Sequence, residues 1–595
     1  LPMSEQQKDE FTLAANPPWD HAVLQSTYIY NSDDARRQEM ADQFEKNGDV
    51  ADTVNAGCIL NAGEYVIFDF GRTIFGYPVV SLGGNENDIV DVVCGEHLIG
   101  NQVIAYTGTR RNLTVLTLDG RKRDRWLAST PMGFRYIMLQ VRAASQKIVV
   151  ENVHARYHSH GFLKSGSFES GNPVLNQIWQ TGITTMEATY QGHFIDAPAG
   201  EQTQYIADAM IQSWAAYHVS GGYKQAENAL RAFAGTQFET GELNSASPSG
   251  FFQVLPDFTL LWIIWLHRHY NYTGNQTLLK ELMPTAEKIL AYFNSMAIAD
   301  DGPIGDLQDY LGTPPFIDHD PAIVRSGIST GLNAIYNRAL LCAAFLEAEL
   351  GYDANAQMYA KRSASLAAYM RTLNWNGEKG LFVDSYDDSM QSENCSWQSN
   401  VLAMFGALAD NDQYENIWNK LFQAEAPYTR FDAGEFENPY FKFFVGQVAF
   451  ALGKSQWMSD MMCYYWGSML EAGAATWWEL FSPEYKQDTR LFSRCHGYGT
   501  SPNGFIISEI AGLRPAEPGM KKLFFAPALL NDLPWVKATL PTVNGTVNLE
   551  WQRTENGGID VTINSAYPLE IIPLLPQEST LNVTFNLGDN VNIPE

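Results

Sequence analysis

The stretch Asp196-Ala-Pro-Ala-Gly-Glu201-Gln-Thr-Gln-Tyr205-Ile-Ala-Asp208 opens a segment of helical character. Pro198 suits the first turn of a helix, because its missing N–H would have no partner there in any case. From this proline the sequence predicts a helix that runs without a break to about Val219. This segment is one of many of the same kind, and their number decides the fold.

A long helical region surrounds this stretch, from about residue 172 to 515. Apolar segments at helical spacing follow one another there, separated by short breaks that contain Gly and Pro. The clearest segments are 174–190, 256–270, 278–297, 329–349, 354–373, 396–409, 440–452 and 456–470. Roughly a dozen helices fit, and no short exact repeat points to a solenoid. A dozen helices paired as hairpins predict a closed toroid, with one ring of helices inside another.

Strand patterns flank the helical region on both sides. From about residue 55 to 165, short β-branched and aromatic runs alternate with Gly and Asp, which is typical of a β-sandwich. The residues before them are polar, with one short helix expected at 33–46. From about residue 516 the strand pattern returns and predicts a small antiparallel β-domain. We therefore expect three domains: 1–165 (β-sandwich with an irregular leader), 166–515 (helical toroid) and 516–595 (β-domain).

Composition restricts the partners of the chain. Its 39 basic and 67 acidic residues give a formal net charge of -28, which repels nucleic acid and anionic membranes. A neutral ligand such as a sugar fits this charge, although solubility alone would also explain it. The six cysteines are scattered without the spacing of a zinc site or a disulfide framework, so most are expected to be buried thiols. No apolar run approaches the roughly 20 residues of a membrane-spanning helix.

The opening stretch also carries candidate chemistry. On the predicted helix Glu201, Tyr205 and Asp208 share one face, because they are spaced i, i+4 and i+7. Asp196 lies just before the helix and can reach over the same face. One carboxyl can act as an acid, another can bind hydroxyls, and the ring can cover the apolar face of a pyranose. The alternative is a charged helix face in solvent, which the spacing alone favours.

A second candidate motif is Gly473-Ala-Ala-Thr-Trp477-Trp478-Glu479. The two rings directly before a carboxylate can shield it and stack on a sugar. The alternative is a pair of core tryptophans beside a surface glutamate. Downstream, His496 lies in a glycine-rich loop, where a histidine is often only a structural hydrogen-bonding group.

The order of these motifs resembles that of glycoside hydrolase family 78, the α-L-rhamnosidases, and their close relatives. The resemblance covers roughly residues 60 to 595. It rests on the motifs Phe68-Asp69-Phe70-Gly71-Arg72, Gly95-Glu96, Gly133-Phe134-Arg135-Tyr136, 168–179, Asn438-Pro-Tyr440, Trp466-Gly-Ser-Met-Leu470, Ala475-Thr-Trp-Trp-Glu479 and 510–519, together with the acidic cluster. It implies an (α/α)6 toroid between two β-domains.

The resemblance also implies a reaction, the hydrolysis of a glycoside with inversion. Glu201 would be the general acid that protonates the leaving oxygen, and Glu479 the general base that activates water. Their carboxyl groups should then stand roughly 6.5–9.5 Å apart, to leave room for that water. No metal or other cofactor is needed. The expected partner is an oligosaccharide or glycoside substrate, most simply one with a terminal α-L-rhamnose.

The remaining candidate residues would bind the sugar. By the same resemblance, Asp196 and Asp208 bind hydroxyl groups and tune the acid. We expect Tyr205 to stack on the sugar where the family places Trp, and His496 to bind a hydroxyl. Two further candidates from the second motif are Trp477 and Trp478.

The chain departs from the family pattern beside the acid. Gly200 precedes Glu201 and Gln202 follows it, where the family commonly has arginines, so a related deoxysugar is also considered. Three alternatives come from other classes: a polysaccharide lyase, a glycoside phosphorylase and a non-catalytic carbohydrate-binding relative. A lyase would need a Tyr or His base and a cationic groove, and a phosphorylase would hold phosphate with basic residues. From the resemblance, a secreted or periplasmic setting is favoured over the cytoplasm.

Overall fold

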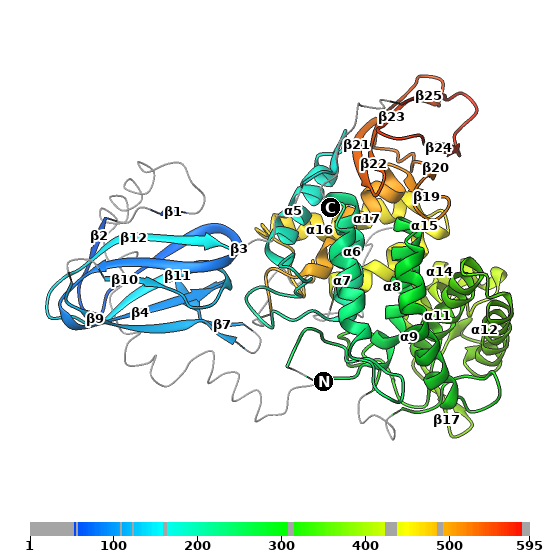
Figure 1. Cartoon of the computed structure of the whole chain (residues 1–595), viewed down its shortest axis with the longest axis horizontal. Helices are drawn as coiled ribbons and strands as arrows, with labels where there is room; N and C mark the ends of the chain where they lie inside the picture. Colours follow the sequence, from blue (N-terminus) through cyan, green and yellow to red (C-terminus); the bar gives the residue numbers. More distant parts are fainter. Residues whose placement is uncertain are drawn as a thin grey trace.

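The protein is described by a computed structural model, in which a β-sheet domain, a helical domain and a second β-domain follow one another (Figure 1). The structure describes residues 53–54, 57–107, 110–121, 124–158, 164–250, 252–307, 314–422, 437–484 and 492–585. The helix expected at 33–46 lies outside these residues.

The N-terminal domain is built on one eight-stranded antiparallel sheet with the strand order β1-β12-β3-β11-β4-β9, in which β10 also pairs with β3 and β2 with β12. Its strands are β1 (Thr53–Val54), β2 (Cys58–Leu60), β3 (Tyr65–Gly83), β4 (Glu86–Gly95), β9 (Leu113–Asp119), β10 (Asp124–Leu127), β11 (Met132–Ala143) and β12 (Ile148–Tyr157). The first half of β3 pairs with β11, and its second half pairs with β10 and β12. Apolar side chains of these strands, such as Phe68, Val92 and Leu139, fill one core. The predicted N-terminal β-sandwich is confirmed.

Four short strands extend this domain toward the helices. They form two hairpins, β5 (His97–Ile99) with β6 (Gln102–Ile104), and β7 (Tyr106–Thr107) with β8 (Arg110–Arg111).

Twelve helices within the described residues form the helical domain, in two rings. The inner ring consists of α6 (Ile206–Val219), α8 (Pro256–Thr273), α11 (Thr330–Glu349), α13 (Trp397–Phe405), α15 (Pro439–Ala451) and α17 (Ser501–Phe505), which continues into the π-helical turn η3 (Ile506–Ile510). The outer ring consists of α5 (Pro173–Thr189), α7 (Tyr223–Ala234), α9 (Gln276–Ser295), α12 (Asp353–Leu373), α14 (Asn411–Leu421) and α16 (Ser455–Glu471). Each inner helix contacts the next one, and α17 closes the ring on α6. This is the predicted (α/α)6 toroid.

Burial explains which helix belongs to which ring. Every residue of α6 is buried, because this helix packs against neighbours on all sides. By contrast α12 buries only one stripe, which includes Tyr359, Leu366 and Met370, and turns polar residues to solvent. Because the two rings alternate along the chain, the inner helices all run in one direction and their N-termini meet at one end. Five small strands, β14 to β18, decorate the connections between helices: Ile328–Ser329, Trp375–Asn376, Leu381–Phe382, Ser385–Asp387 and Met390–Gln391.

The C-terminal domain contains a five-stranded sheet (β13-β21-β22-β23-β25) and a three-stranded sheet (β19-β20-β24). Its strands are β13 (Ser167–Ser170), β19 (Leu513–Pro515), β20 (Lys522–Phe525), β21 (Trp535–Thr542), β22 (Gly545–Arg553), β23 (Ile559–Ser565), β24 (Glu570–Pro573) and β25 (Thr580–Phe585). The predicted β-domain is confirmed, but two of its strand pairs, β20–β24 and β23–β25, are parallel rather than antiparallel. β13 precedes α5, the first helix of the toroid, and belongs to the five-stranded sheet of the C-terminal domain.

One predicted helix boundary is wrong. The helix begins at Ile206 and not at Pro198, so Glu201 and Tyr205 are not on a helix face with Asp208. Residues 197–201 form a turn, and Gln202 has a φ of 55°, which a right-handed helix cannot contain. The turn is closed by local bonds: the N–H of Asp196 donates to the carbonyl of Thr203 at 2.8 Å.

Candidate active site

Two carboxyl groups are buried where α6 begins. Asp208 lies in its first turn, and Asp196 accepts a hydrogen bond from the N–H of Thr203 at 2.8 Å. Burial, followed by the charges of Glu201 and Asp208, raises the pKa of Asp196 well above its usual range. Burial and then the charge of Glu201 raise the pKa of Asp208 to about 8. Asp208 therefore favours the protonated form near neutral pH.

Glu201 is exposed, at the end of a turn whose preceding residues 197–200 are buried. Its Oε2 accepts a hydrogen bond of 2.5 Å from the hydroxyl of Tyr205, so the predicted pair meets through the turn rather than along a helix. The N-terminal sheet supports the turn from behind. The N–H of Gly133 donates to the carbonyl of Pro198 at 2.8 Å, and the side chain of Asn112 donates to the carbonyl of Ala199 at 3.4 Å. The position of Glu201 thus depends on the N-terminal domain.

Glu479 enters the same cluster from a distant part of the chain. Its N–H donates to the carbonyl of Ser493, and its Oε2 accepts from the N–H of Ser493 at 3.0 Å. Burial, together with the charges of Glu201 and Asp208, raises the pKa of Glu479 to about 8, against the hydrogen bond from Ser493. The charge of Glu201 acts on Asp208, and the charges of both act on Glu479, so the three groups lie within electrostatic reach of one another.

The two predicted tryptophans of the second motif are both buried. Trp477 is fully buried, and its backbone N–H donates a hydrogen bond to the hydroxyl of Thr185 at 2.9 Å. Trp478 is also buried, and the guanidinium of Arg494 lies 4.5 Å from its ring centroid. In this structure both rings pack as core residues, the alternative considered above. Their contact with a sugar stays a prediction.

His496 is buried beside Asp208. Its Nδ1 lies 3.7 Å from Oδ1 of Asp208, and its ring centroid lies 3.7 Å from that of Tyr498. Burial, and then the charge of His319, lowers the pKa of His496 well below its usual range. The imidazole is therefore neutral and has one nitrogen available as an acceptor. Its predicted role as a hydroxyl-binding group stays open.

Glu96 is a functional residue that the motif analysis did not single out for a role. It comes from the end of β4, and its buried carboxyl group accepts from the hydroxyl of Thr73 at 3.1 Å, the hydroxyl of Ser493 at 3.0 Å and the N–H of Arg494 at 3.1 Å. Burial raises its pKa to about 7, against these hydrogen bonds. Glu96 thus holds the segment that binds Glu479. The only sequence signal was its place in the Gly95-Glu96 motif.

A second group was also missed, at the start of the inner helices α13 and α15. Asp318 is buried and accepts from the side chains of Gln398 at 3.0 Å and Asn438 at 2.7 Å. Burial raises its pKa to about 6. Tyr440 and Tyr498 lie nearby with ring centroids 5.8 Å apart. Asp318 lies in a loop without any motif, so the sequence carried no signal for it.

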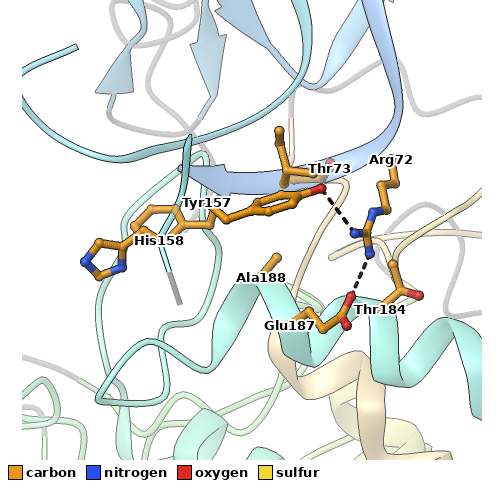
Figure 2. Close-up of a pocket in the computed structure, with 9 residues that line it drawn as sticks. Arg72, Thr73, Tyr157, His158, Thr184, Glu187 and Ala188 are labelled. Carbon is orange, nitrogen blue, oxygen red and sulfur yellow. Dashed lines mark hydrogen bonds and ion pairs between the residues drawn. The ribbon is translucent and has the colours of Figure 1, made fainter. Parts of the chain in front are cut away.

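A cavity of about 150 Å³ lies where the N-terminal sheet meets α5 (Figure 2). Arg72 of β3 reaches across it, with Nη1 on Oε2 of Glu187 at 2.6 Å and Nη2 on the hydroxyl of Tyr157 at 3.3 Å. Arg72 thus joins the N-terminal sheet to α5. The next residue, Thr73, donates a hydrogen bond to Glu96 of the candidate site.

Three further properties concern the chain as far as it is described. No three His, Cys, Asp or Glu side chains within the described ranges are arranged to hold a metal ion. None of the helices that the structure describes is both long enough and apolar enough to cross a membrane. Four of the six cysteines are buried, and the other two, Cys395 and Cys463, are partly buried, which confirms the prediction that most are buried thiols.

The toroid of six helical hairpins, the flanking β-domains and the carboxyl cluster at the N-terminal ends of the inner helices define a protein of the six-hairpin glycosidase class. Residues 164–510 match the bacterial alpha-L-rhamnosidase 6 hairpin glycosidase domain. Residues 60–158 match the concanavalin-like domain of the same proteins, and residues 512–590 match their C-terminal domain. The chain belongs to the bacterial α-L-rhamnosidase family, as the motif order predicted.

Individual relatives show the same architecture at low identity. An alpha-L-rhamnosidase of Alteromonas sp. (strain LOR) is 21% identical over 551 residues, which are 85% of this chain and 56% of that protein. The GH78 family rhamnosidase of Bacillus sp. GL1 has a TM-score of 0.79 and 23% identity, over 88% of this chain and 54% of the other. A rhamnosidase from Klebsiella oxytoca with rhamnose bound has a TM-score of 0.66 and 20% identity, over 76% and 88%. The chain thus spans little more than half the length of the first two relatives.

Proposed function

We propose that the protein hydrolyses terminal α-L-rhamnosides, or glycosides of a similar deoxysugar, with inversion at the anomeric carbon. Glu201 is the general acid in this proposal and Glu479 is the general base. The observation that carries it is the cluster itself, in which these two groups lie within electrostatic reach although they are almost 280 positions apart in the chain. Family membership and the rhamnose-bound Klebsiella oxytoca relative support rhamnose as the sugar.

The charge balance of the cluster suits an acid–base pair. An inverting enzyme needs one carboxyl group protonated and the other ionised at the same time. The charge of Glu201 raises the pKa of Glu479, so protonation of Glu201 lowers the pKa of Glu479 and favours its ionised form. Glu479 holds its proton to about pH 8 in the free protein, so the fraction of molecules with an ionised base, and with it kcat/KM, should rise toward pH 8.

Hydrogen bonds hold each of the two groups. The hydroxyl of Tyr205 fixes one oxygen of Glu201, and burial and the charge of Glu201 keep that hydroxyl protonated by raising its pKa. The N–H of Ser493 fixes Oε2 of Glu479 and leaves Oε1 for a water molecule. Such orientation limits the loss of entropy when the transition state forms.

The surrounding groups are suited to bind a neutral sugar. Asp208, protonated below about pH 8, can donate a hydrogen bond to a hydroxyl, and neutral His496 can accept one. A uronate lyase binds its anionic substrate with cationic groups, whereas this cluster consists of carboxyl groups, which weighs against that class. A phosphorylase would require basic residues for phosphate, whereas the nearest groups of this site are acidic.

The test is hydrolysis of p-nitrophenyl α-L-rhamnoside compared with other p-nitrophenyl glycosides. Glu201→Gln and Glu479→Gln should each lower kcat by at least about a hundredfold. A matched control is Glu393→Gln, which neutralises an exposed carboxylate of the same domain. Full activity of either site variant would overturn the acid–base assignment.

A second measurement separates the mechanisms. Proton NMR of the first product should show the β-anomer of the released sugar before mutarotation. Retention would contradict the inverting mechanism. Turnover that requires phosphate would indicate the phosphorylase, and an unsaturated product the lyase. Binding of the sugar without turnover would indicate a non-catalytic relative.

A further inference from the structure

A cavity of about 500 Å³ lies at the opposite end of the toroid from the carboxyl cluster. The cluster is at the N-terminal ends of the inner helices, whereas this cavity is lined by their C-terminal halves. α8 shows the difference: Asp257 in its first turn binds the N–H groups of residues 316 and 317, and Arg268 in its last two turns faces the cavity. We call this space the C-end cavity. Its wall includes Trp214, Arg268, Arg338, Phe405, Gln447 and Glu509.

Arg268 has donor capacity that the protein does not use. Its Nη2 donates to the side-chain oxygen of Gln447 at 3.1 Å, and its guanidinium lies 5.1 Å from the ring centroid of Trp214 and 5.0 Å from that of Phe443. Its Nη1 is buried and has no hydrogen-bond partner among the residues that the structure describes. The contacts with the two aromatic rings stabilise the buried charge of Arg268, but they provide no hydrogen-bond acceptor for its Nη1.

Arg338 presents the same pattern from the neighbouring helix α11. Its guanidinium lies 5.3 Å from the ring centroid of Phe405, and its buried Nε has no hydrogen-bond partner within the described part of the chain. Neither Arg338 nor Arg268 forms an ion pair with a described carboxylate. Among the described residues, two cations therefore face one cavity without a directly paired carboxylate, an arrangement that an anion bound between them would stabilise.

The other titratable groups around Arg268 and Arg338 leave the positive charge of the two arginines in place. Burial lowers the pKa of Arg268 to about 10, and the charge of Arg338 contributes in the same direction. Burial and the two arginines lower the pKa of His267 to about 3, so the imidazole adds no charge. The wall also carries the carboxylates of Glu349, Glu509 and Glu517. Glu349 accepts from the hydroxyl of Tyr270 at 3.0 Å, and Glu509 pairs with Arg514.

We propose that the C-end cavity binds a small organic ligand through one oxyanion group, a carboxylate or a phosphate, held by Arg268 and Arg338. The planar guanidinium groups match either oxyanion, because both offer two adjacent oxygens to a fork of N–H donors. The volume lies within the range of small-molecule sites, roughly 300–1,000 Å³, and exceeds that of a bare ion. The aromatic wall of Trp214, Phe345 and Phe405 suits the apolar face of the ligand. This site is separate from the proposed glycosidase site.

The test is calorimetric titration and thermal unfolding of the full chain with D-glucuronate and D-glucose 6-phosphate in the millimolar range, with D-glucose as the neutral control. We expect at least one of the two anions to bind and to raise Tm, and D-glucose to do neither. The anion that binds identifies the oxyanion class. Arg268→Met and Arg338→Met should each weaken binding at least tenfold, whereas Arg231→Met, which removes a surface arginine, should not.

The proposal is overturned if neither anion binds the unmodified chain, or if both arginine variants bind as tightly as the original. Should a methionine variant fail to fold, Arg268→Lys keeps the charge and removes the fork. It should still weaken binding at least tenfold, because a lysine cannot make the paired hydrogen bonds. Unchanged affinity in Arg268→Lys would also contradict the proposal.

Discussion

Glu479→Gln should abolish activity and at the same time stabilise the protein at alkaline pH. Burial and the neighbouring carboxylates raise the pKa of Glu479 from 4.5 to about 8. In the unfolded chain the group releases its proton near its ordinary pKa, but in the folded protein it keeps that proton to about pH 8. Stability is therefore fully present below the unfolded value of 4.5, and it is lost as the pH rises through 8.

The size of the effect follows from the shift. A change from 4.5 to 8 corresponds to about 5 kcal/mol, at 1.36 kcal/mol for each pH unit. Asp208 titrates in the same pH range as Glu479 and takes up part of this free energy, so a gain of about 2–5 kcal/mol is expected for the variant. Glutamine has nearly the same shape as protonated glutamate. The two proteins should therefore be about equally stable at pH 5, and the variant more stable at pH 9.

The assay is thermal unfolding at one scan rate between pH 5 and 9. The difference in Tm between Glu479→Gln and the original chain should grow through this range to about 2–4 °C and level off above pH 8. Glu393→Gln, the exposed control, should show no such growth. A Tm difference that does not change with pH, or a variant less stable than the original at pH 9, would refute the reasoning.

Three further outcomes are expected. Tyr205→Phe removes the hydrogen bond to Glu201 and should lower kcat about tenfold, with Tm within about two degrees of the original, measured on the same p-nitrophenyl substrate. Gly133→Ala should also lower kcat, because its Cβ would lie 2.3 Å from the backbone of the turn that carries Glu201. The control is Gly57→Ala, whose Cβ would have no atom within 4 Å, and equal activity of the two variants would contradict this prediction. kcat/KM should fall above about pH 8, where Asp208 loses the proton with which it binds the sugar, and a flat profile to pH 10 would argue against that role.

Helix periodicity and motif order were sufficient to predict the architecture, because both depend on local spacing. The inner helix α6 and the outer helix α12 both follow the 3.6-residue pattern that the sequence displays. The start of α6 was predicted eight residues too early, since Pro198 is as compatible with a turn as with a first helical turn. What decides between them is the bond from Gly133 to the carbonyl of Pro198, which joins two domains. Such a contact leaves no trace in local sequence.

The candidate site shows the same division between local and distant information. Glu201 and Glu479 were found because each lies in a motif, and their mutual influence agrees with that choice. Asp318 could not be found, because its role depends on Gln398 and Asn438, which are 80 and 120 positions away. The buried position of Trp477 likewise follows from packing against α5, through Thr185. Aromatic character alone does not distinguish a ring that faces a ligand from one that faces the core.

The N-terminal domain contacts both segments that carry the proposed acid and base. The turn that carries Glu201 binds this sheet through Gly133, and the segment that holds Glu479 binds it through Glu96. Both attachments use backbone groups or short buried side chains, so neither can shift by an ångström without breaking a hydrogen bond. Inversion requires a separation that admits one water molecule, and a helical toroid alone would leave both segments in loops. The sheet is therefore part of the proposed active site, and its two attachments explain why a β-domain accompanies the toroid.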